Sequence, residues 1–265
     1  MPIRSVFAAK LRARTPVIGT FVKLRDPSVI EMLGLCGFDF VVIDAEHAPF
    51  DREALSFATL AARAANLAAL VRVPDADGTW ISTALECGAA GIVAPQVTSA
   101  AMAEILARRM RYGADRGFSP STAAARFGQR GIQDHLQSQP EETVLVCQIE
   151  DRSAVALAAE IAAVSGVDGL LVGPVDLAVS EGLTDPTAPE IKALGAHVLS
   201  AARTAGISGG MFLSDPAKAS EWSDCGGTLF VLGSDQSFLM QSARAGLSAA
   251  RGTLSGGGSR HGNRT

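Results

Sequence analysis

Acidic side chains close two separate apolar runs of this 265-residue chain. Glu150 ends the run TVLVCQIE, and Asp176 ends the run VDGLLVGPVD. A carboxylate at the end of a buried strand is costly to desolvate unless a positive charge meets it, and carboxylates in consecutive strand–helix units can meet the same cation. These oxygen ligands predict a hard divalent ion, Mg2+ or Mn2+, with Co2+ as a further candidate. Alternatively, each carboxylate caps the following helix or pairs with an arginine, although Asp151 is a better cap candidate than Glu150. Gln96 and Gln148 also lie at strand ends and are candidate hydrogen-bond donors.

A third apolar run ends in Asp44, Glu46 and His47, and a fourth ends in Arg72. Imidazole exchanges protons near neutral pH, so His47 is a candidate general base, with Asp44 as the partner that fixes its tautomer. Arg72 is a candidate donor to a developing oxyanion. Equally, it could hold Glu46 or Asp44 in a structural ion pair.

The elements that must position these residues repeat along the whole chain. Strands are expected at residues 17–24, 38–44, 68–73, 91–97, 143–150, 167–175, 207–213 and 228–233. Helices are expected to open at Asp26, Asp51, Ser99, Asp151 and Asp215, and four of the helix–strand junctions carry a closing glycine, Gly37, Gly88, Gly166 or Gly226. This alternation favours an α/β fold, a closed (β/α)8 (TIM) barrel, in which active sites form at the carboxyl ends of the strands. The alternative, an open dinucleotide-binding sheet, lacks its glycine-rich phosphate loop after the first strand.

One domain is expected over residues 1–252, followed by a disordered tail at 253–265, because the final segment is polar and rich in glycine. The longest interruption of the pattern, residues 112–142, has no strong periodicity. Long segments of this kind usually serve as lids or subunit contacts, and disorder is the alternative.

Composition narrows the class of protein. The chain is 48% hydrophobic with a net charge of −4, which indicates a sizeable core and no basic surface for nucleic acid or an anionic membrane. No apolar run has the length of a signal peptide or a membrane span. The four cysteines have no Cys-x-x-Cys spacing and are expected to be small buried residues in a reducing compartment, so we expect a soluble cytoplasmic protein.

Four motifs together resemble the metal-dependent (class II) pyruvate aldolases of the HpcH/HpaI family. They are DAEHAPFD (44–51), VRVP (71–74), QIE (148–150) and GPVDL (173–177), and the likeness runs from about residue 17 to residue 250. The resemblance implies a (β/α)8 barrel that assembles as a homo-oligomer, a hexamer or a trimer, with the last helix exchanged between subunits. It also implies an aldolase, a carbon–carbon lyase that reversibly cleaves 4-hydroxy-2-oxo acids to pyruvate and an aldehyde through a metal-stabilised pyruvate enolate.

The resemblance also assigns roles. It makes Glu150 and Asp176 the metal ligands. His47 is then the base, Asp44 its partner and Arg72 the group that contacts the keto oxygen. Glu46 supports these residues without contacting the substrate. The substrate-binding residues that it implies are Gln148, Gly173, Pro174, Val175 and a serine of the long segment, Ser119 or Ser121. Glu86 matches a position that acts across a subunit interface in some members, and Phe21 replaces a common tryptophan.

Four alternatives remain open on the residues alone. Two use the same metal barrel: an oxaloacetate decarboxylase and an acyl-CoA ester lyase. The third, a lysine-dependent aldolase, would depend on Lys23, the only lysine near a strand end. The fourth is a non-catalytic carbohydrate- or metabolite-binding barrel. The expected partners are small molecules, namely pyruvate or another 2-oxo acid and an aldehyde.

Overall fold

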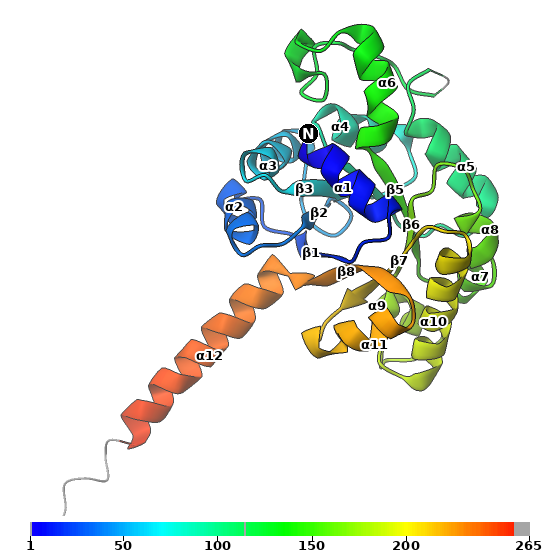
Figure 1. Ribbon diagram of the computed structural model, residues 1–265. Helices are drawn as coiled ribbons and strands as arrows, with labels where there is room; N and C mark the ends of the chain where they lie inside the picture. Colours follow the sequence, from blue (N-terminus) through cyan, green and yellow to red (C-terminus); the bar gives the residue numbers. More distant parts are fainter. Residues whose placement is uncertain (1, 114, 257–265) are drawn as a thin grey trace, which may run out of the picture.

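Eight parallel strands close into a barrel surrounded by helices in the computed structural model, which describes residues 2–113 and 115–256 (Figure 1). The strands are β1 (Val17–Val22), β2 (Phe40–Asp44), β3 (Ala68–Arg72), β4 (Gly91–Ala94), β5 (Val144–Ile149), β6 (Gly169–Val172), β7 (Ser208–Leu213) and β8 (Gly227–Ser234). Each strand pairs with the next along the chain, and β8 pairs with β1. The predicted (β/α)8 barrel is confirmed.

The helices are α1 (Ile3–Arg12), α2 (Pro27–Leu35), α3 (Arg52–Ala64), α4 (Gly78–Glu86), α5 (Ala100–Arg109), α6 (Ile132–Glu142), α7 (Arg152–Ala156), α8 (Ala158–Ala162), α9 (Pro174–Ser180), α10 (Pro189–Thr204), α11 (Ala219–Asp224) and α12 (Asp235–Gly256), with short 3-10 turns at Arg126–Gly128 and Pro216–Lys218. All five predicted N-caps accept a hydrogen bond from a backbone N–H of the first turn: Asp26, Asp51, Ser99, Asp151 and Asp215. The four predicted closing glycines adopt left-handed φ angles between +90° and +99°.

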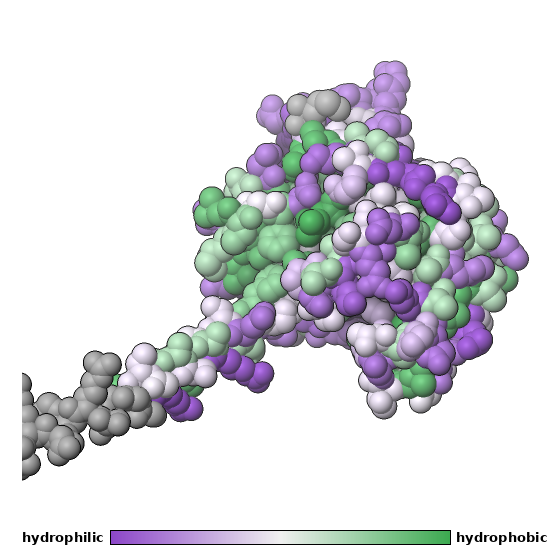
Figure 2. Space-filling view, turned by 60° about the horizontal axis from the view of Figure 1, so that its bottom comes forward, coloured by the Kyte–Doolittle hydropathy of each residue, from purple (hydrophilic) through white to green (hydrophobic). Residues whose placement is uncertain are grey.

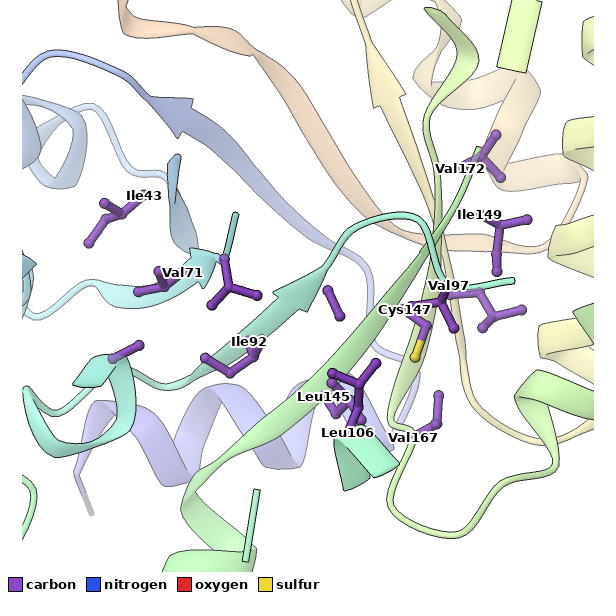
Figure 3. Close-up of a cluster of buried hydrophobic side chains, with 14 of the residues drawn as sticks. Ile43, Val71, Ile92, Val97, Leu106, Leu145, Cys147, Ile149, Val167 and Val172 are labelled. Carbon is purple, nitrogen blue, oxygen red and sulfur yellow. The ribbon is translucent and has the colours of Figure 1, made fainter. Parts of the chain in front are cut away.

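The barrel has two apolar layers. Inside it, side chains of alternate strand positions pack together, and α1 closes the amino-terminal end, where the rings of Phe7 and Phe40 lie 5.2 Å apart. Outside it, the other strand positions pack against the helices; Figure 3 shows Leu145, Cys147 and Ile149 of β5 in this outer layer. Because neighbouring residues of a strand point to opposite sides, Gln148 must point inward.

Several expectations need correction. The predicted strand at 167–175 ends at Val172, because Pro174 fixes the first turn of α9. The aperiodic segment 112–142 contains α6, whose polar sequence hides its period, and this segment extends away from the barrel beside α4 (Figure 1). Of the four cysteines only Cys147 is buried, because residues just before a closing glycine lie at exposed helix ends.

The carboxyl-terminal helix α12 projects away from the barrel (Figure 1). It continues through Gly256, past the predicted domain boundary at 252, and the rest of the predicted tail, residues 257–265, lies outside the described residues. Within the described residues, no helix is both long enough and apolar enough to cross a membrane.

Candidate active site

The inner face of the barrel carries the polar residues at its carboxyl end. Along β2 and β3, every second residue points inward, and the last inward positions are Asp44 and Arg72. The strand register pairs Asp44 directly with Arg72, so the two side chains lie next to each other. On β5 the same alternation brings Gln148 inward, and Glu150 follows just beyond the strand end.

Asp44 and Arg72 form a buried, two-pronged ion pair. Arg72 donates from Nε and Nη2 to the two carboxylate oxygens of Asp44, at 3.0 and 2.7 Å. Asp44 also accepts from the backbone N–H of His47 at 3.1 Å, and the ammonium of Lys23 lies 3.3 Å from its Oδ2. Burial by itself disfavours the charge of Asp44, but Arg72, the His47 N–H and Lys23 outweigh it and lower the pKa of this carboxyl.

His47 lies at the rim of this ion pair with more than half of its side chain exposed. Its Nε2 lies 3.8 Å from the carboxylate of Glu46, which in turn lies 3.3 Å from Nε of Arg72. Asp44 therefore anchors the backbone of His47, while Glu46 is the carboxylate that faces its ring. Burial raises the pKa of Glu46, with further contributions from the charges of Asp44 and Asp176 and an opposing effect of Arg72.

Among the described residues, the groups that hold Glu150 are polar neighbours and not a cation. It accepts hydrogen bonds from the backbone N–H of Gln96, at 2.6 Å, and from the side-chain amide of Gln148. Gln96 adopts a left-handed backbone (φ +52°), which is unusual for a residue other than glycine and costs about 1 kcal/mol or more. Burial raises the pKa of Glu150, and the negative charges of Asp176 and Glu46 raise it further.

Asp176 lies in the first turn of α9, after Gly173, Pro174 and Val175. An ideal Cβ at position 173 would come within 3.0 Å of Gln148 Nε2 and of Glu150 Oε2, so glycine is the residue that fits beside them. As predicted, Asp151 caps α7, which leaves the side chain of Glu150 available to the site.

Two adjoining hollows meet at His47 and Asp176. The first, of about 260 Å³, is lined by Phe21, Lys23, His47, Arg72, Gln148, Leu171, Val172, Gly173, Pro174, Val175, Asp176, Phe212, Gly233 and Ser234. The second, of about 470 Å³, is lined by Glu46, His47, Gln96, Thr98, Glu150, Asp151 and Asp176. Most of the predicted site residues therefore line one continuous cleft, while Asp44 lies buried beneath it.

The carboxylates of this cleft fit a hard cation. Among the described residues, neither Glu150 nor Asp176 forms an ion pair, and a divalent ion between them would relieve their mutual repulsion. Residues 2–113 and 115–256 contain no cluster of three or more His, Cys, Asp or Glu side chains arranged to hold a metal. A cation at this site would therefore take two protein carboxylates and complete its coordination with substrate and water.

The structure does not bring three predicted residues into the cleft of a single chain. Ser119 and Ser121 lie in the segment between α5 and β5 and pair with each other at 3.1 Å. That segment packs against the end of α4, where the N–H of Ala124 donates to the carbonyl of Glu86. The carboxylate of Glu86 faces Arg52 in a different surface hollow.

Few sequence signals mark the part of the cleft that is lined by the ends of β1, β7 and β8. Phe212 is an inward position of β7, so strand alternation could have identified it. Its ring lies 5.9 Å from that of Phe21, and Phe21 also lies under the guanidinium of Arg72 at 4.6 Å. Lys23 and Ser234 complete this part of the cleft, and only the closure of β8 onto β1 brings these two residues together.

A (β/α)8 barrel with carboxylate, imidazole and guanidinium groups gathered at the carboxyl ends of its strands is the arrangement of an enzyme. Comparison with known proteins agrees: the HpcH/HpaI aldolase/citrate lyase family model matches residues 17–242, and the chain belongs to this family.

The chain is 32% identical to a hydroxypyruvate/pyruvate aldolase of Roseovarius nubinhibens, over 93% of this chain and 97% of the relative. It is 34% identical to a 5-keto-4-deoxy-D-glucarate aldolase of Klebsiella pneumoniae, over 86% and 90%. Among solved structures, an HpcH/HpaI aldolase/citrate lyase family protein from Burkholderia cenocepacia superposes with a TM-score of 0.88 at 32% identity, covering 93% of this chain and 99% of that one.

Proposed function

We propose that this enzyme is a class II aldolase that reversibly cleaves 4-hydroxy-2-oxo acids into pyruvate and an aldehyde. The observation that carries the proposal is that a proton-transfer group beside a cation and a pair of carboxylates line the same cleft. The guanidinium of Arg72 lies beside His47, while Glu150 and Asp176 form an adjoining anionic centre. The names of the relatives from Roseovarius and Klebsiella support the same class of reaction.

In this proposal Glu150 and Asp176 hold the divalent ion, Mg2+ or Mn2+, with Co2+ as a further candidate. When bound, such an ion supplies Lewis acidity, which polarises a 2-oxo group and makes the neighbouring C–H bonds more acidic. Gln148 orients the carboxylate of Glu150 through its side-chain amide. The main-chain N–H groups of Val175 and Asp176, in the first turn of α9, receive the carboxylate of pyruvate.

His47 moves the proton in both directions. In condensation it removes a methyl proton of pyruvate, directly or through a water, and then returns it to the aldehyde oxygen once the new carbon–carbon bond has formed. In cleavage it takes the 4-hydroxyl proton, as microscopic reversibility requires. Glu46, whose carboxylate lies 3.8 Å from Nε2 of His47, orients the ring.

Arg72 stabilises the negative charge that develops on the 2-oxo oxygen. Its hydrogen bonds to Asp44 use Nε and Nη2, so Nη1 is the nitrogen available for this oxygen. Asp44 is the residue that holds Arg72 and the backbone of His47 in place.

Three competing uses of this barrel differ from the proposal in mechanism or in substrate. A lysine-dependent aldolase needs an amine that is free to attack the 2-oxo carbon, whereas the amine of Lys23 lies 3.3 Å from the buried carboxylate of Asp44. An acyl-CoA ester lyase or an oxaloacetate decarboxylase would keep the same carboxylates and act on a CoA ester or on oxaloacetate.

The assay follows pyruvate methyl-proton exchange with D2O by NMR, and then condensation of pyruvate with a panel of aldehydes, with Mg2+, with Mn2+ and with EDTA. We expect exchange and condensation that require metal and that are insensitive to borohydride. Metal-independent turnover with borohydride trapping would overturn the metal mechanism. Turnover of oxaloacetate or CoA esters alone, without any condensation, would overturn the aldolase assignment.

We further propose that the enzyme is a homo-oligomer, a trimer or a hexamer, in which α12 packs on a neighbouring subunit. Large apolar side chains of this helix are at least 49% exposed: Leu239, Met240, Leu247 and Leu254. Figure 2 shows a broad hydrophobic area on the barrel beside the base of α12, which is the kind of surface that such a helix covers. In this assembly, Glu86 and one of Ser119 and Ser121 approach a neighbour's cleft. Light scattering of the purified chain tests the number of subunits.

All four cysteines are unpaired, which favours a reducing cytoplasm as the site of action.

A further inference from the structure

Another cavity lies at the amino-terminal end of the barrel, away from the candidate active site. Its volume is about 470 Å³, which is within the range of small-molecule sites. It is lined by the start of α1, by one face of α3 and by the segment between α5 and β5, including the 3-10 turn Arg126–Gly128. Ala69, near the start of β3, and Gly88, which precedes β4, also line it, so it lies at the end of the barrel where the strands begin.

Four arginines line this cavity, and two of them share a buried carboxylate. Arg4 donates to Glu142 at 2.6 Å, and Arg130 donates to both oxygens of the same carboxylate at 3.0 and 2.8 Å. Arg130 also lies 3.7 Å from the exposed carboxylate of Asp134. Burial lowers the pKa of Arg4, an effect that Glu142 opposes, and the charges of Arg130 and Arg63 lower it further. The positive charges are therefore close enough to act on one another.

The other two arginines, Arg63 and Arg126, are available to a ligand. Both are exposed, and within the described residues neither forms an ion pair with a carboxylate. The four guanidinium groups thus face only Glu142 and Asp134, and two positive charges remain unbalanced, although the whole chain has a net charge of −4. A hollow in which one sign of charge prevails attracts small ligands of the opposite sign.

The arrangement of these arginines favours phosphate over carboxylate. Arg4 comes from α1 and Arg63 from α3, whereas Arg126 and Arg130 come from the segment between α5 and β5, so the donors approach from several sides. The oxygens of a carboxylate lie in one plane, whereas a tetrahedral phosphate accepts hydrogen bonds from several directions and pairs well with guanidinium groups. The cavity is much larger than one phosphate group, so a ligand that fills it has further atoms.

Phe127 adds an apolar surface beside the arginines. Its side chain lines the cavity and is 70% exposed, which is unusual for an aromatic ring without a partner. Arg126 and Phe127 both have left-handed backbones, with φ of +54° and +53°, a conformation that residues other than glycine seldom adopt outside ligand sites and tight turns. An exposed ring next to guanidinium groups is a surface on which a nucleobase stacks.

We propose that this cavity binds an organic diphosphate of the class of the nucleoside diphosphates. Arg63 and Arg126 bind the diphosphate, the charges of Arg4 and Arg130 add to the attraction, and Phe127 stacks on the base. The site is separate from the candidate active site, so this inference goes beyond the proposed aldolase function and does not depend on it. A ligand here joins the segment between α5 and β5 to α3 and should slow hydrogen exchange of that segment.

The test is isothermal titration calorimetry of the full chain with ADP, pyrophosphate and adenosine, at low ionic strength. EDTA is present, so that no metal bound at Glu150 and Asp176 recruits the nucleotide. We expect ADP to bind about 10-fold more tightly than pyrophosphate, as stacking of one base on one aromatic ring predicts, and adenosine to show no binding. Hydrogen exchange of residues 122–131 should slow when ADP is added.

Variants locate the binding site. Arg63→Gln and Arg126→Gln should each weaken ADP binding by about 10- to 100-fold, because each removes a charge-assisted hydrogen bond. Phe127→Ser should reduce the affinity for ADP to that for pyrophosphate. The matched control is Arg108→Gln, which removes an exposed arginine from a different hollow, and it should leave ADP binding unchanged. Arg72→Ala should also leave it unchanged, since Arg72 lies in the candidate active site.

Four results would overturn the proposal. The first is no binding of ADP by the wild type at millimolar concentration, and this arm requires no variant to fold. The second is binding that Arg72→Ala abolishes and Arg63→Gln preserves, because the nucleotide would then occupy the other cleft. The third is adenosine or pyrophosphate binding as tightly as ADP, and the fourth is an equal loss in Arg63→Gln and Arg108→Gln, which overall charge alone predicts. The condensation assays test the aldolase function separately, since none of these measurements involves turnover.

Discussion

Replacing Asp44 by Asn tests the central ion pair of the site. The carboxylate is fully buried and receives two hydrogen bonds from Arg72, at 3.0 and 2.7 Å, and one from the backbone of His47, at 3.1 Å. An amide keeps one acceptor oxygen and turns an NH2 group toward a guanidinium that is itself a donor. Removing one partner of a buried ion pair typically costs 3–5 kcal/mol, and we expect about 3 kcal/mol here because Lys23 and solvent can partly rearrange.

Urea unfolding followed by circular dichroism, at a fixed protomer concentration, measures this loss. The matched control is Glu141→Gln, which removes the charge from an exposed pair in which Arg12 and Glu141 lie 3.5 Å apart. We expect the control to change the free energy of unfolding by less than about 1 kcal/mol. If Asp44→Asn lost no more stability than this control, the view that the Asp44–Arg72 pair holds the site together would be refuted.

The pH dependence of stability in the wild type and in Asp44→Asn gives a second test of this ion pair. Because the folded-state pKa of Asp44 is lowered, its stabilising contribution is present above the ordinary value of 3.8 and is lost as the pH falls through the folded-state pKa. The difference in stability between the wild type and Asp44→Asn should therefore be constant near neutral pH and narrow below about pH 3.8. A difference that widened on acidification would contradict this sign.

Three further outcomes are expected. Arg72→Ala should lower kcat by about 10²–10³-fold, since it removes a donor to the developing negative charge; near-wild-type turnover would exclude this role. Gly173→Ala should weaken Mn2+ binding in calorimetry by about 10-fold or more, because the new methyl group displaces Glu150, and unchanged affinity would separate Glu150 from the metal. Burial raises the pKa of the Cys147 thiol to about 12, so the folded protein should be alkylated at exposed Cys36 and not at Cys147, as peptide mass spectrometry would reveal.

The sequence predicted most of the barrel and much of the cleft for one reason. In a parallel barrel, strand ends that are far apart in sequence meet at one rim, so polar residues that end apolar runs must converge. Asp44, Arg72, Gln148 and Glu150 were placed in this way. The helix caps could also be predicted from the sequence, because an Asp or Ser side chain and a closing glycine act on their immediate neighbours.

The structure of the segment between α5 and β5 could not be predicted from local sequence. Its helix α6 contains Pro140 and few apolar residues, so the apolar face that identifies a helix is hard to recognise. Its packing depends on distant residues such as Arg4, which donates to the carboxylate of Glu142 at 2.6 Å and to the backbone of Ala124. For this reason the sequence could not predict that Ser119 and Ser121 lie away from the cleft of their own chain.

By itself, the sequence determined the alternation of strands and helices and the residue types at the strand ends, since these follow from local periodicity and local capping. Only the tertiary structure decided which of these residues touch: that Arg72 binds Asp44, that Glu46 and not Asp44 faces the His47 ring, and that Lys23 joins the wall of the cleft. Such pairings depend on strand register and on the closure of β8 against β1, and both are set by the packing of the whole barrel.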